Sequence, residues 1–377
     1  MNILLKYFKG DKVIWVIIIL LSLISILAVY SSTFTLAHDK ANDTSYLLKH
    51  SFILIFGFVL MYWIHGIDYK YFTLFSRLAL IISIPLLVLT FFMGSSINDA
   101  TRWLIVPVIN LSFQTSDFAK IALVMYLAYM LTKRNTTIKD FKKGFLPLII
   151  PTLIICGLIF PTNFSTAALT FGTSVVIMYI GQTQLKHILL TILACLVFAI
   201  LFIIIAPEGT RAGTWKSRIV NFSKGEEGDN YQSDHSKMAI ASGMIIGKGP
   251  GESSIKNFLP QAYSDFIFAI IIEEYGTIIG GFFVVMLYLI LIYRIVSIAK
   301  NCEKEYPMYL SIGLGLLIIF QAFSNMAVAV NIIPVTGQPL PLISMGGTSI
   351  WFSSIALGMI LSVSRSVNEK EKVEINE

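Results

Sequence analysis

Long apolar stretches, separated by short polar segments, recur along almost the whole chain. Most are about 17 to 25 residues long, which is enough to cross the hydrocarbon core of a bilayer. Because an unpaired backbone cannot cross lipid, each stretch should be a helix. The pattern therefore predicts an all-α, polytopic membrane protein of about ten transmembrane helices, over residues 13–32, 49–65, 77–93, 117–132, 145–160, 164–181, 187–206, 265–293, 307–330 and 346–363.

Composition supports the same fold class. Of the 377 residues, 56% are hydrophobic and 13% are charged, and the mean hydropathy is +0.77. A soluble domain carries about a quarter charged residues, so a soluble protein is excluded. The cysteines and histidines are scattered without the spacing of metal ligands, so we expect no bound metal and no protein-bound cofactor.

Lysine and arginine are distributed unevenly between alternate loops. If the N-terminus lies in the cytoplasm, the cytoplasmic loops carry most of these residues, and the short outer loops hold only Lys40, Lys49 and Arg102. We therefore expect a multi-pass protein of the cytoplasmic (inner) membrane with both termini in the cytoplasm. The one large extracytoplasmic loop would be 207–264. The net charge of +6 follows from this bias, and without a basic stripe it does not predict nucleic-acid binding.

The chain shows no linker and no repeat of fixed period, which favours one domain, 1–365, followed by a cytoplasmic tail, 366–377. The tail is short and charged, and we expect it to be disordered. The first apolar segment follows a basic stretch, as a signal peptide would, but it is too long for a signal peptide and its end, 31–33, is a poor cleavage site. Apolar and polar residues interleave over 243–260, so this part of the outer loop should pack on the bundle.

Carboxylates stand out where the long loop meets the eighth segment. Asp265 lies at that join, and Glu273 and Glu274 follow within the segment. An ionised group at membrane depth is costly and usually serves a function. Asp265 can alternatively be a plain helix N-cap, where aspartate is favoured. At least one of the two glutamates is expected to form a structural hydrogen bond between helices.

A second polar group surrounds the start of the fourth segment. Arg102 and Trp103 lie in the preceding loop, Gln114 opens the segment, and Asp117 and Lys120 share a helix face because they are three residues apart. The Asp117–Lys120 pair is either part of a binding site or a neutralised structural pair. Trp103 is either a sugar platform or an anchor at the membrane interface.

A third polar group precedes the tenth segment, in the runs 334–341 and 344–349. The prolines and glycine of the first run, 334–341, favour a non-helical, re-entrant turn that is buried in protein over a chemical site.

These three groups together resemble the SEDS family, the RodA and FtsW proteins. The matching blocks occur in family order and span nearly the whole chain: Arg102-Trp103 with Gln114-x-Ser-Asp-Phe-Ala-Lys120, then Lys256-x-x-Leu-Pro-x-x-x-x-Asp265-Phe-Ile-Phe-Ala, then Pro334-x-Thr-Gly-x-Pro-Leu-Pro-x-x-Ser344-x-Gly-Gly. The outer loop, with its run over 247–251, is more similar to the division branch, FtsW, than to the elongation branch, RodA. Asn163 stands where the family usually has aspartate, so no charge role is expected there.

The resemblance implies a peptidoglycan glycosyltransferase, an inverting hexosyltransferase that polymerises lipid II during cell division. It implies that Asp265 is the general base for the acceptor 4-hydroxyl, and that Arg102 and Lys120 neutralise the leaving diphosphate. Further substrate-binding residues implied by the resemblance are Trp103, Gln114, Lys256, Glu273 and Ser344.

The same resemblance implies three kinds of partner besides lipid II: a class B penicillin-binding protein (a transpeptidase), other membrane proteins of the divisome, and membrane lipid. It places the protein at the division septum. A divalent cation would be held only through the substrate diphosphate. Two alternatives stay open. One is a lipid II flippase, in which the interior charges form a translocation path, although we find no inverted repeat of broken helices. The other is a non-catalytic divisome scaffold.

Overall fold

The structure, a computed structural model of the chain, describes six segments and six single positions between 213 and 258. The segments are 8–38, 45–97, 100–106, 111–205, 231–254 and 263–376. In parts of the strands and at some helix ends, only the backbone is described. Of the predicted site residues, Lys256 lies outside the described residues, and the side chain of Arg102 does too.

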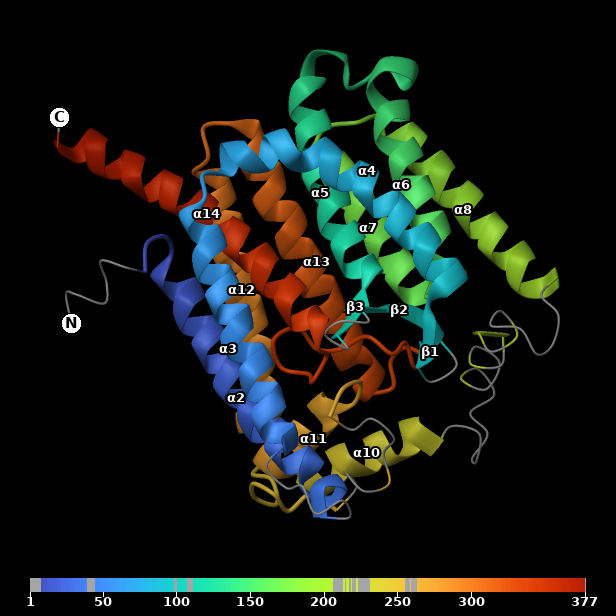
Figure 1. Cartoon of the computed structure of the whole chain (residues 1–377), viewed down its shortest axis with the longest axis vertical. Coiled ribbons are helices and arrows are strands. Elements are labelled where there is room, and N and C mark those ends of the chain that lie inside the picture. Colours follow the sequence, from blue (N-terminus) through green and yellow to red (C-terminus); the bar gives the residue numbers. More distant parts are fainter. Residues whose placement is uncertain are drawn as a thin grey trace. The chain divides into compact units, whose positions relative to one another are not determined.

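Every predicted apolar stretch contains a helix (Figure 1). In chain order these are α2 (Lys12–His38), α3 (Ser45–Gly66), α4 (Tyr69–Met93), α5 (Thr115–Lys133), α6 (Leu146–Ile159), α7 (Phe164–Ile180), α8 (Leu185–Ile205), α11 (Ile267–Tyr275), α12 (Phe283–Lys300), α13 (Glu305–Ala329) and α14 (Thr348–Asn376). The eighth stretch is continuous from α11 to α12 through the π-helical turn η4 (Gly276–Phe282). Among the described residues, 8 helices are long and apolar enough to span a membrane. The prediction of an all-α membrane fold is confirmed.

Two local expectations were wrong. The segment with Arg102 and Trp103 is not a loop but part of an antiparallel sheet of β1 (Ser95–Ile97), β2 (Ala100–Val106) and β3 (Leu111–Gln114). The large outer loop, for which no secondary structure was predicted, contains a helix, α10 (Tyr231–Gly243). The tail is helical as far as Asn376, which agrees with its lack of glycine and proline.

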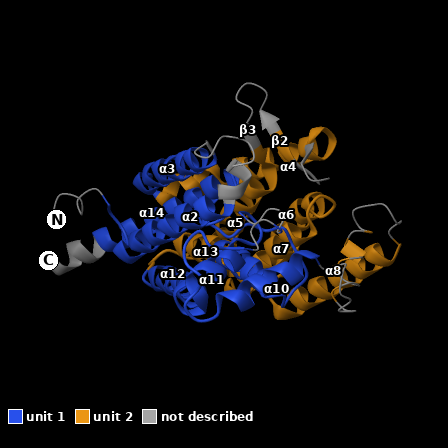
Figure 2. Cartoon of the chain, turned by 90° about the horizontal axis from the view of Figure 1, so that it is seen from below, with its two compact units in different colours: residues 1–68, 227–301, 318–377 blue, residues 69–226, 302–317 orange. Residues whose placement is uncertain are grey.

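The chain forms two compact units (Figure 2). Unit 1 comprises residues 1–68, 227–301 and 318–377, and unit 2 comprises residues 69–226 and 302–317. The boundary falls within α13. Whether the two act as the single domain 1–365 stays a prediction.

In unit 1, α3 packs along α14, while α2 contacts α3, α11 and α12. Small residues let α3 and α14 approach closely. A Cβ added at Gly358 would lie 2.9 Å from the carbonyl oxygen of Met61, and one added at Gly57 would lie 2.8 Å from the Ser354 hydroxyl. Since backbone meets backbone at Gly358, this position cannot hold a larger side chain without moving a helix.

One carboxylate ties the start of α2 to the end of α12. Asp11 Oδ1 accepts hydrogen bonds from the amides of Val13 (2.8 Å) and Ile14 (3.1 Å), which caps α2. Its Oδ2 accepts from the guanidinium of Arg294, with 2.9 Å to Nε. Asp11 is buried, whereas the side chain of Arg294 is 35% exposed, so the pair is only partly shielded from solvent.

The stretch between α13 and α14 is non-helical, and much of it is buried. Gln338, Leu340, Leu342, Ile343 and Ser344 are all buried. The expectation of a non-helical turn buried in protein is confirmed for this part of the chain.

In unit 2, α5 packs against α4, α6 and α7, and most of its residues are buried. The first part of α13 joins this unit, and Gly313 lies close to Val124 and Ile177. In contrast, the only residue of α8 that is buried is Ile188. An apolar helix with so much exposed surface is typical of a helix that faces lipid.

Candidate functional site

Asp265 lies just before α11. The N-cap residue of that helix is Phe266, which makes no side-chain capping hydrogen bond. Asp265 is therefore not at the N-cap position, and that interpretation is wrong. The residue is partly exposed, and its Oδ1 accepts a hydrogen bond of 3.0 Å from the hydroxyl of Ser264. The carboxylate is therefore partly accessible to solvent.

The backbone around Asp265 is fixed from α13. Asn325 donates from Nδ2 to the carbonyl oxygen of Asp265 (2.9 Å) and to that of Gln338 (2.7 Å). Gln321, one helical turn earlier, donates to the carbonyl of Pro339 (2.9 Å). These two amides hold Asp265 and the buried turn 338–345 against the same face of α13.

The buried turn also bonds directly to the residues before Asp265. The hydroxyl of Ser344 accepts from the amide of Leu340 (2.7 Å) and donates to the carbonyl of Ser264. The amide of Met345 donates to the carbonyl of Tyr263 (3.0 Å). Ser344, predicted as a substrate-binding residue, thus has its hydroxyl engaged by backbone. Its contact with substrate stays a prediction.

Tyr263 places a phenol near the carboxylate. Burial raises the pKa of this tyrosine, and the nearby Tyr46 and Asp265 raise that pKa further. The phenol therefore stays protonated at neutral pH and can donate a hydrogen bond close to Asp265.

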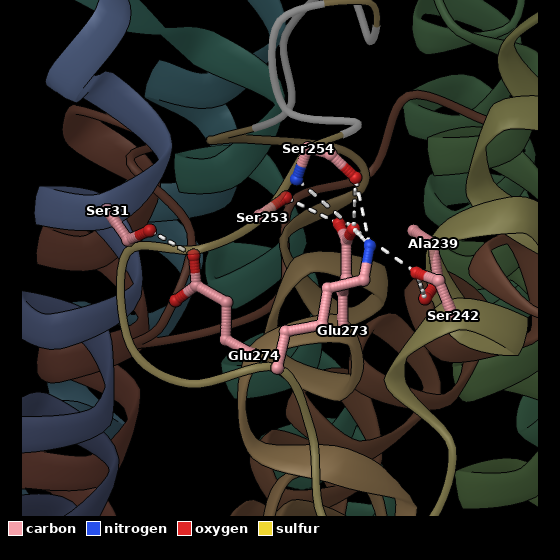
Figure 3. Close-up of polar contacts among 8 residues, drawn as sticks. Ser31, Ala239, Ser242, Ser253, Ser254, Glu273 and Glu274 are labelled. Atoms are coloured by element: carbon pink, nitrogen blue, oxygen red, sulfur yellow. Dashed lines mark hydrogen bonds and ion pairs between the residues drawn. The ribbon is translucent and has the colours of Figure 1, made fainter.

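Glu273 is completely buried and accepts a dense set of hydrogen bonds (Figure 3). The donors are Lys248 Nζ (2.7 Å), Ser242 Oγ (3.2 Å), the amide and hydroxyl of Ser254 (3.2 and 3.0 Å), and Ser253 Oγ (2.5 Å). All of them come from α10 or from the segment that follows it. These contacts give Glu273 a structural role, since they fasten the end of the outer loop to α11.

Glu274 points the other way, towards α2, where it accepts a hydrogen bond from Ser31 (Figure 3). The expectation that one of the two glutamates bonds between helices is confirmed. The expectation that the end of the outer loop packs on the bundle is also confirmed, because the amides of Lys248 and Gly249 donate to the carbonyls of Glu273 and Glu274 (2.9 and 3.0 Å).

In unit 2, the sheet brings two of the predicted residues together. Trp103 in β2 is the register partner of Gln114 in β3, and α5 begins at the next residue. Gln114 donates from Nε2 to the hydroxyl of Ser116 (2.9 Å). Arg102 precedes Trp103 in β2.

Lys120 and Asp117 form a buried ion pair of 2.7 Å within the first turns of α5. The carboxylate also lies in the first turn, where it stabilises the helix dipole. The structural interpretation of the pair is therefore supported, and a role of Lys120 in binding stays a prediction. Asn163 caps α7 by accepting from the amide of Thr166 (3.1 Å), which explains a polar residue without charge there.

Sequence reasoning missed Asn325 and Gln321, which hold Asp265 and the turn. Their signal was present: two amides four residues apart lie on one face of an otherwise apolar helix. It also missed Lys248, whose partner Glu273 lies 25 residues further along the chain. Among the residues that the structure describes, no group of three or more His, Cys, Asp or Glu could hold a metal ion.

Comparison with known proteins gives consistent results. The family described as "Cell cycle protein", which covers FtsW, RodA and SpoVE, matches residues 11–369. The chain is 32% identical over 362 residues to the probable peptidoglycan glycosyltransferase FtsW of Trichlorobacter lovleyi, with 94% of this chain and 93% of that one covered. It is 30% identical over 375 residues to the stage V sporulation protein E of Bacillus subtilis, with 96% and 98% covered.

Solved structures agree on the fold. A chain from a peptidoglycan synthase complex matches with a TM-score of 0.78 and 23% identity, covering 95% of this chain and 98% of that chain. The rod shape determining protein RodA of Thermus thermophilus matches with a TM-score of 0.69 and 21% identity, covering 95% and 97%.

Proposed function

The chain belongs to the FtsW/RodA/SpoVE family, and on that premise we propose that it is a peptidoglycan glycosyltransferase that polymerises lipid II. The curated relatives named as probable peptidoglycan glycosyltransferases support this activity over nearly the full length of the chain. The active site would face the outside of the cytoplasmic membrane, with both termini in the cytoplasm, as the distribution of lysine and arginine favours.

The observation that carries the proposal is the accessibility of Asp265 compared with the other candidate carboxylates. Glu273 is completely buried beneath its hydrogen-bond donors, and Asp117 is buried beside Lys120, whereas Asp265 is partly exposed. A base must reach the proton that it removes. Asp265 is therefore the carboxylate that best suits the reaction.

The chemistry needs one base. The acceptor 4-hydroxyl attacks the anomeric carbon of the donor sugar and gives its proton to Asp265. The bond from that carbon to the diphosphate oxygen breaks, and the leaving group departs with the electron pair. A single displacement inverts an α-linked diphosphate into a β-1,4 glycosidic bond, so no covalent enzyme intermediate is needed.

We propose that Arg102 and Lys120 bind substrate diphosphate, and that Trp103 and Gln114 contribute to the same binding face of unit 2. Cations stabilise the charge that gathers on a leaving diphosphate. Any divalent cation that takes part would be carried by the diphosphate. Lys256 keeps its predicted substrate role.

The test replaces Asp265 by asparagine in the purified protein. Asp265→Asn preserves size but cannot take a proton, so glycan synthesis from lipid II should fall by about 10²-fold or more, with unchanged thermal unfolding. The matched control is Asp140→Asn, which changes an exposed carboxylate in the same way. Hydrogen bonds from the backbone amides of Lys143 and Lys142, together with the charges of these two lysines, lower the pKa of Asp140. Near-normal polymerisation by the Asp265 variant would refute the assignment of the base.

The same preparation separates the alternatives. Glycan chains made by the protein alone support an enzyme. Movement of lipid II across vesicle membranes without glycan chains supports a flippase. If neither occurs, a scaffold remains.

We propose further that the protein acts in cell division, at the septum, with a class B penicillin-binding protein and other divisome membrane proteins as partners. The relatives that carry the FtsW name support division over elongation, and the fold shared with a chain of a peptidoglycan synthase complex supports a synthase partner. Depletion should produce filaments. Rounded cells without filaments would point to elongation instead.

A further inference from the structure

A histidine is completely buried between two membrane helices of unit 1, and the reaction described above does not use it. His50 lies on α3 and has no exposed surface. Its Nε2 lies 2.7 Å from the hydroxyl of Ser25 on α2. Buried polar atoms are usually hydrogen-bonded, so the hydrogen-bond partners of a buried histidine indicate its structural role.

The contact with Ser25 continues into the buried turn. The Ser25 hydroxyl donates to the carbonyl oxygen of Ile343 at 2.7 Å. A hydroxyl has one hydrogen to give, so Ser25 must accept from His50, and the proton of the neutral ring lies on Nε2. His50 Nδ1 is then an acceptor, and it has no hydrogen-bond partner among the described residues. The ring therefore has one polar contact, and this contact is directed at the turn.

The two residues that follow Ile343 are hydrogen-bonded to the two residues that precede Asp265. The next residue, Ser344, donates to the carbonyl of Ser264, and Met345 donates to the carbonyl of Tyr263. The turn is therefore held on one side by Ser25 and on the other by the residues that lead into Asp265. A shift of the carbonyl of Ile343 would move both donors.

We propose that His50 is a positioning residue for Asp265, acting through Ser25 and the buried turn 338–345. This inference rests on the proposed function, because it concerns the base of that reaction. The competing interpretation is a histidine that only fills the interface between α2 and α3. That role would affect stability and leave the geometry of Asp265 unchanged.

The test compares three variants of the full-length protein in detergent with lipid II as substrate. His50→Met fills the space without a donor, so kcat should fall about tenfold or more, with KM nearly unchanged. His50→Gln places an amide donor near the position of Nε2 and should restore most of the rate. His65→Met is the matched control, because His65 is a buried histidine of the same helix that contacts Tyr62 and Trp15 and should lower stability alone.

A second measurement does not depend on activity. Amide hydrogen exchange at Met345 reports the bond to Tyr263. His50→Met and Ser25→Ala should each speed this exchange, the double variant should add little to either, and His50→Gln and His65→Met should leave it slow. The non-additivity follows because both residues act through one connection.

The outcomes separate this inference from the proposed function. If His50→Met keeps kcat and the protection of Met345, or lowers only the melting temperature, His50 is a packing residue and the inference is wrong. If the His50 variant behaves in this way but Asp265→Asn abolishes polymerisation, the proposed function still stands. If the unmodified protein makes no glycan, the proposed function fails, and the exchange at Met345 still decides whether His50 holds the turn.

Discussion

The ammonium of Lys248 lies 2.7 Å from a carboxylate oxygen of Glu273, and the two partners differ sharply in exposure. The side chain of the lysine is 32% exposed, whereas that of the glutamate is 0% exposed. The pair thus joins a charge that water can still reach to a charge that water cannot reach. Its loss affects the buried partner most.

We expect Lys248→Met to destabilise the protein by about 2 kcal/mol. Removing one member of a buried pair leaves the other charge uncompensated, which costs about 3–5 kcal/mol in full, and the serine donors around Glu273 offset part of that cost. The matched control is Lys237→Met, whose pair with Asp234 is largely exposed and should change stability by less than about 0.5 kcal/mol. Thermal unfolding in detergent measures both. Equal melting temperatures would show that Glu273 does not need its lysine.

The Asp117–Lys120 pair predicts a separation of stability from binding. Lys120→Met leaves the buried carboxylate of Asp117 without its cation and should lower the melting temperature. Adding Asp117→Asn removes the charge and should restore most of the stability. If Lys120 binds diphosphate, the double variant stays stable but binds lipid II about tenfold more weakly. Recovery of both properties together would make the pair purely structural.

The contact between α3 and α14 predicts a steric effect at Gly358. Gly358→Ala puts a methyl group 2.9 Å from the carbonyl oxygen of Met61, so one helix must shift, at a cost of about 1–3 kcal/mol. Gly157→Ala, in α6, is the control, since a Cβ there meets nothing within 4 Å. Unfolding in detergent should show a lower melting temperature for the first variant only. A similar loss in both would mean that helix propensity or lipid contact, not packing, sets the effect.

Much of the fold could be predicted from the sequence because membrane-spanning helices are recognisable by the length and hydropathy of their segments. The ten apolar stretches all contain helices, and the prolines and glycines before α14 indicated a buried non-helical turn. These are local signals that do not depend on distant partners.

The contacts of the site could not be predicted in the same way. Asn325 is an amide in a mostly apolar helix, and nothing in the local sequence indicates its partner. Only the fold brings it to Asp265, which lies 60 residues earlier in the chain. The sheet was missed because strands of three to seven residues give little periodicity beside long helices. Asp265 resembled a helix N-cap because aspartate is favoured at that position. The helix begins two residues after Asp265, so the N-cap position falls on Phe266.

The buried turn has a consequence for biosynthesis. Asp265 emerges from the ribosome well before Ser344, which follows it by 79 residues and bonds to Ser264, 80 residues back. Until the chain has been made as far as Met345, the backbone around Asp265 lacks the bonds that come from Asn325, Ser344 and Met345. A chain that is still being synthesised therefore carries this carboxylate without the contacts that position it.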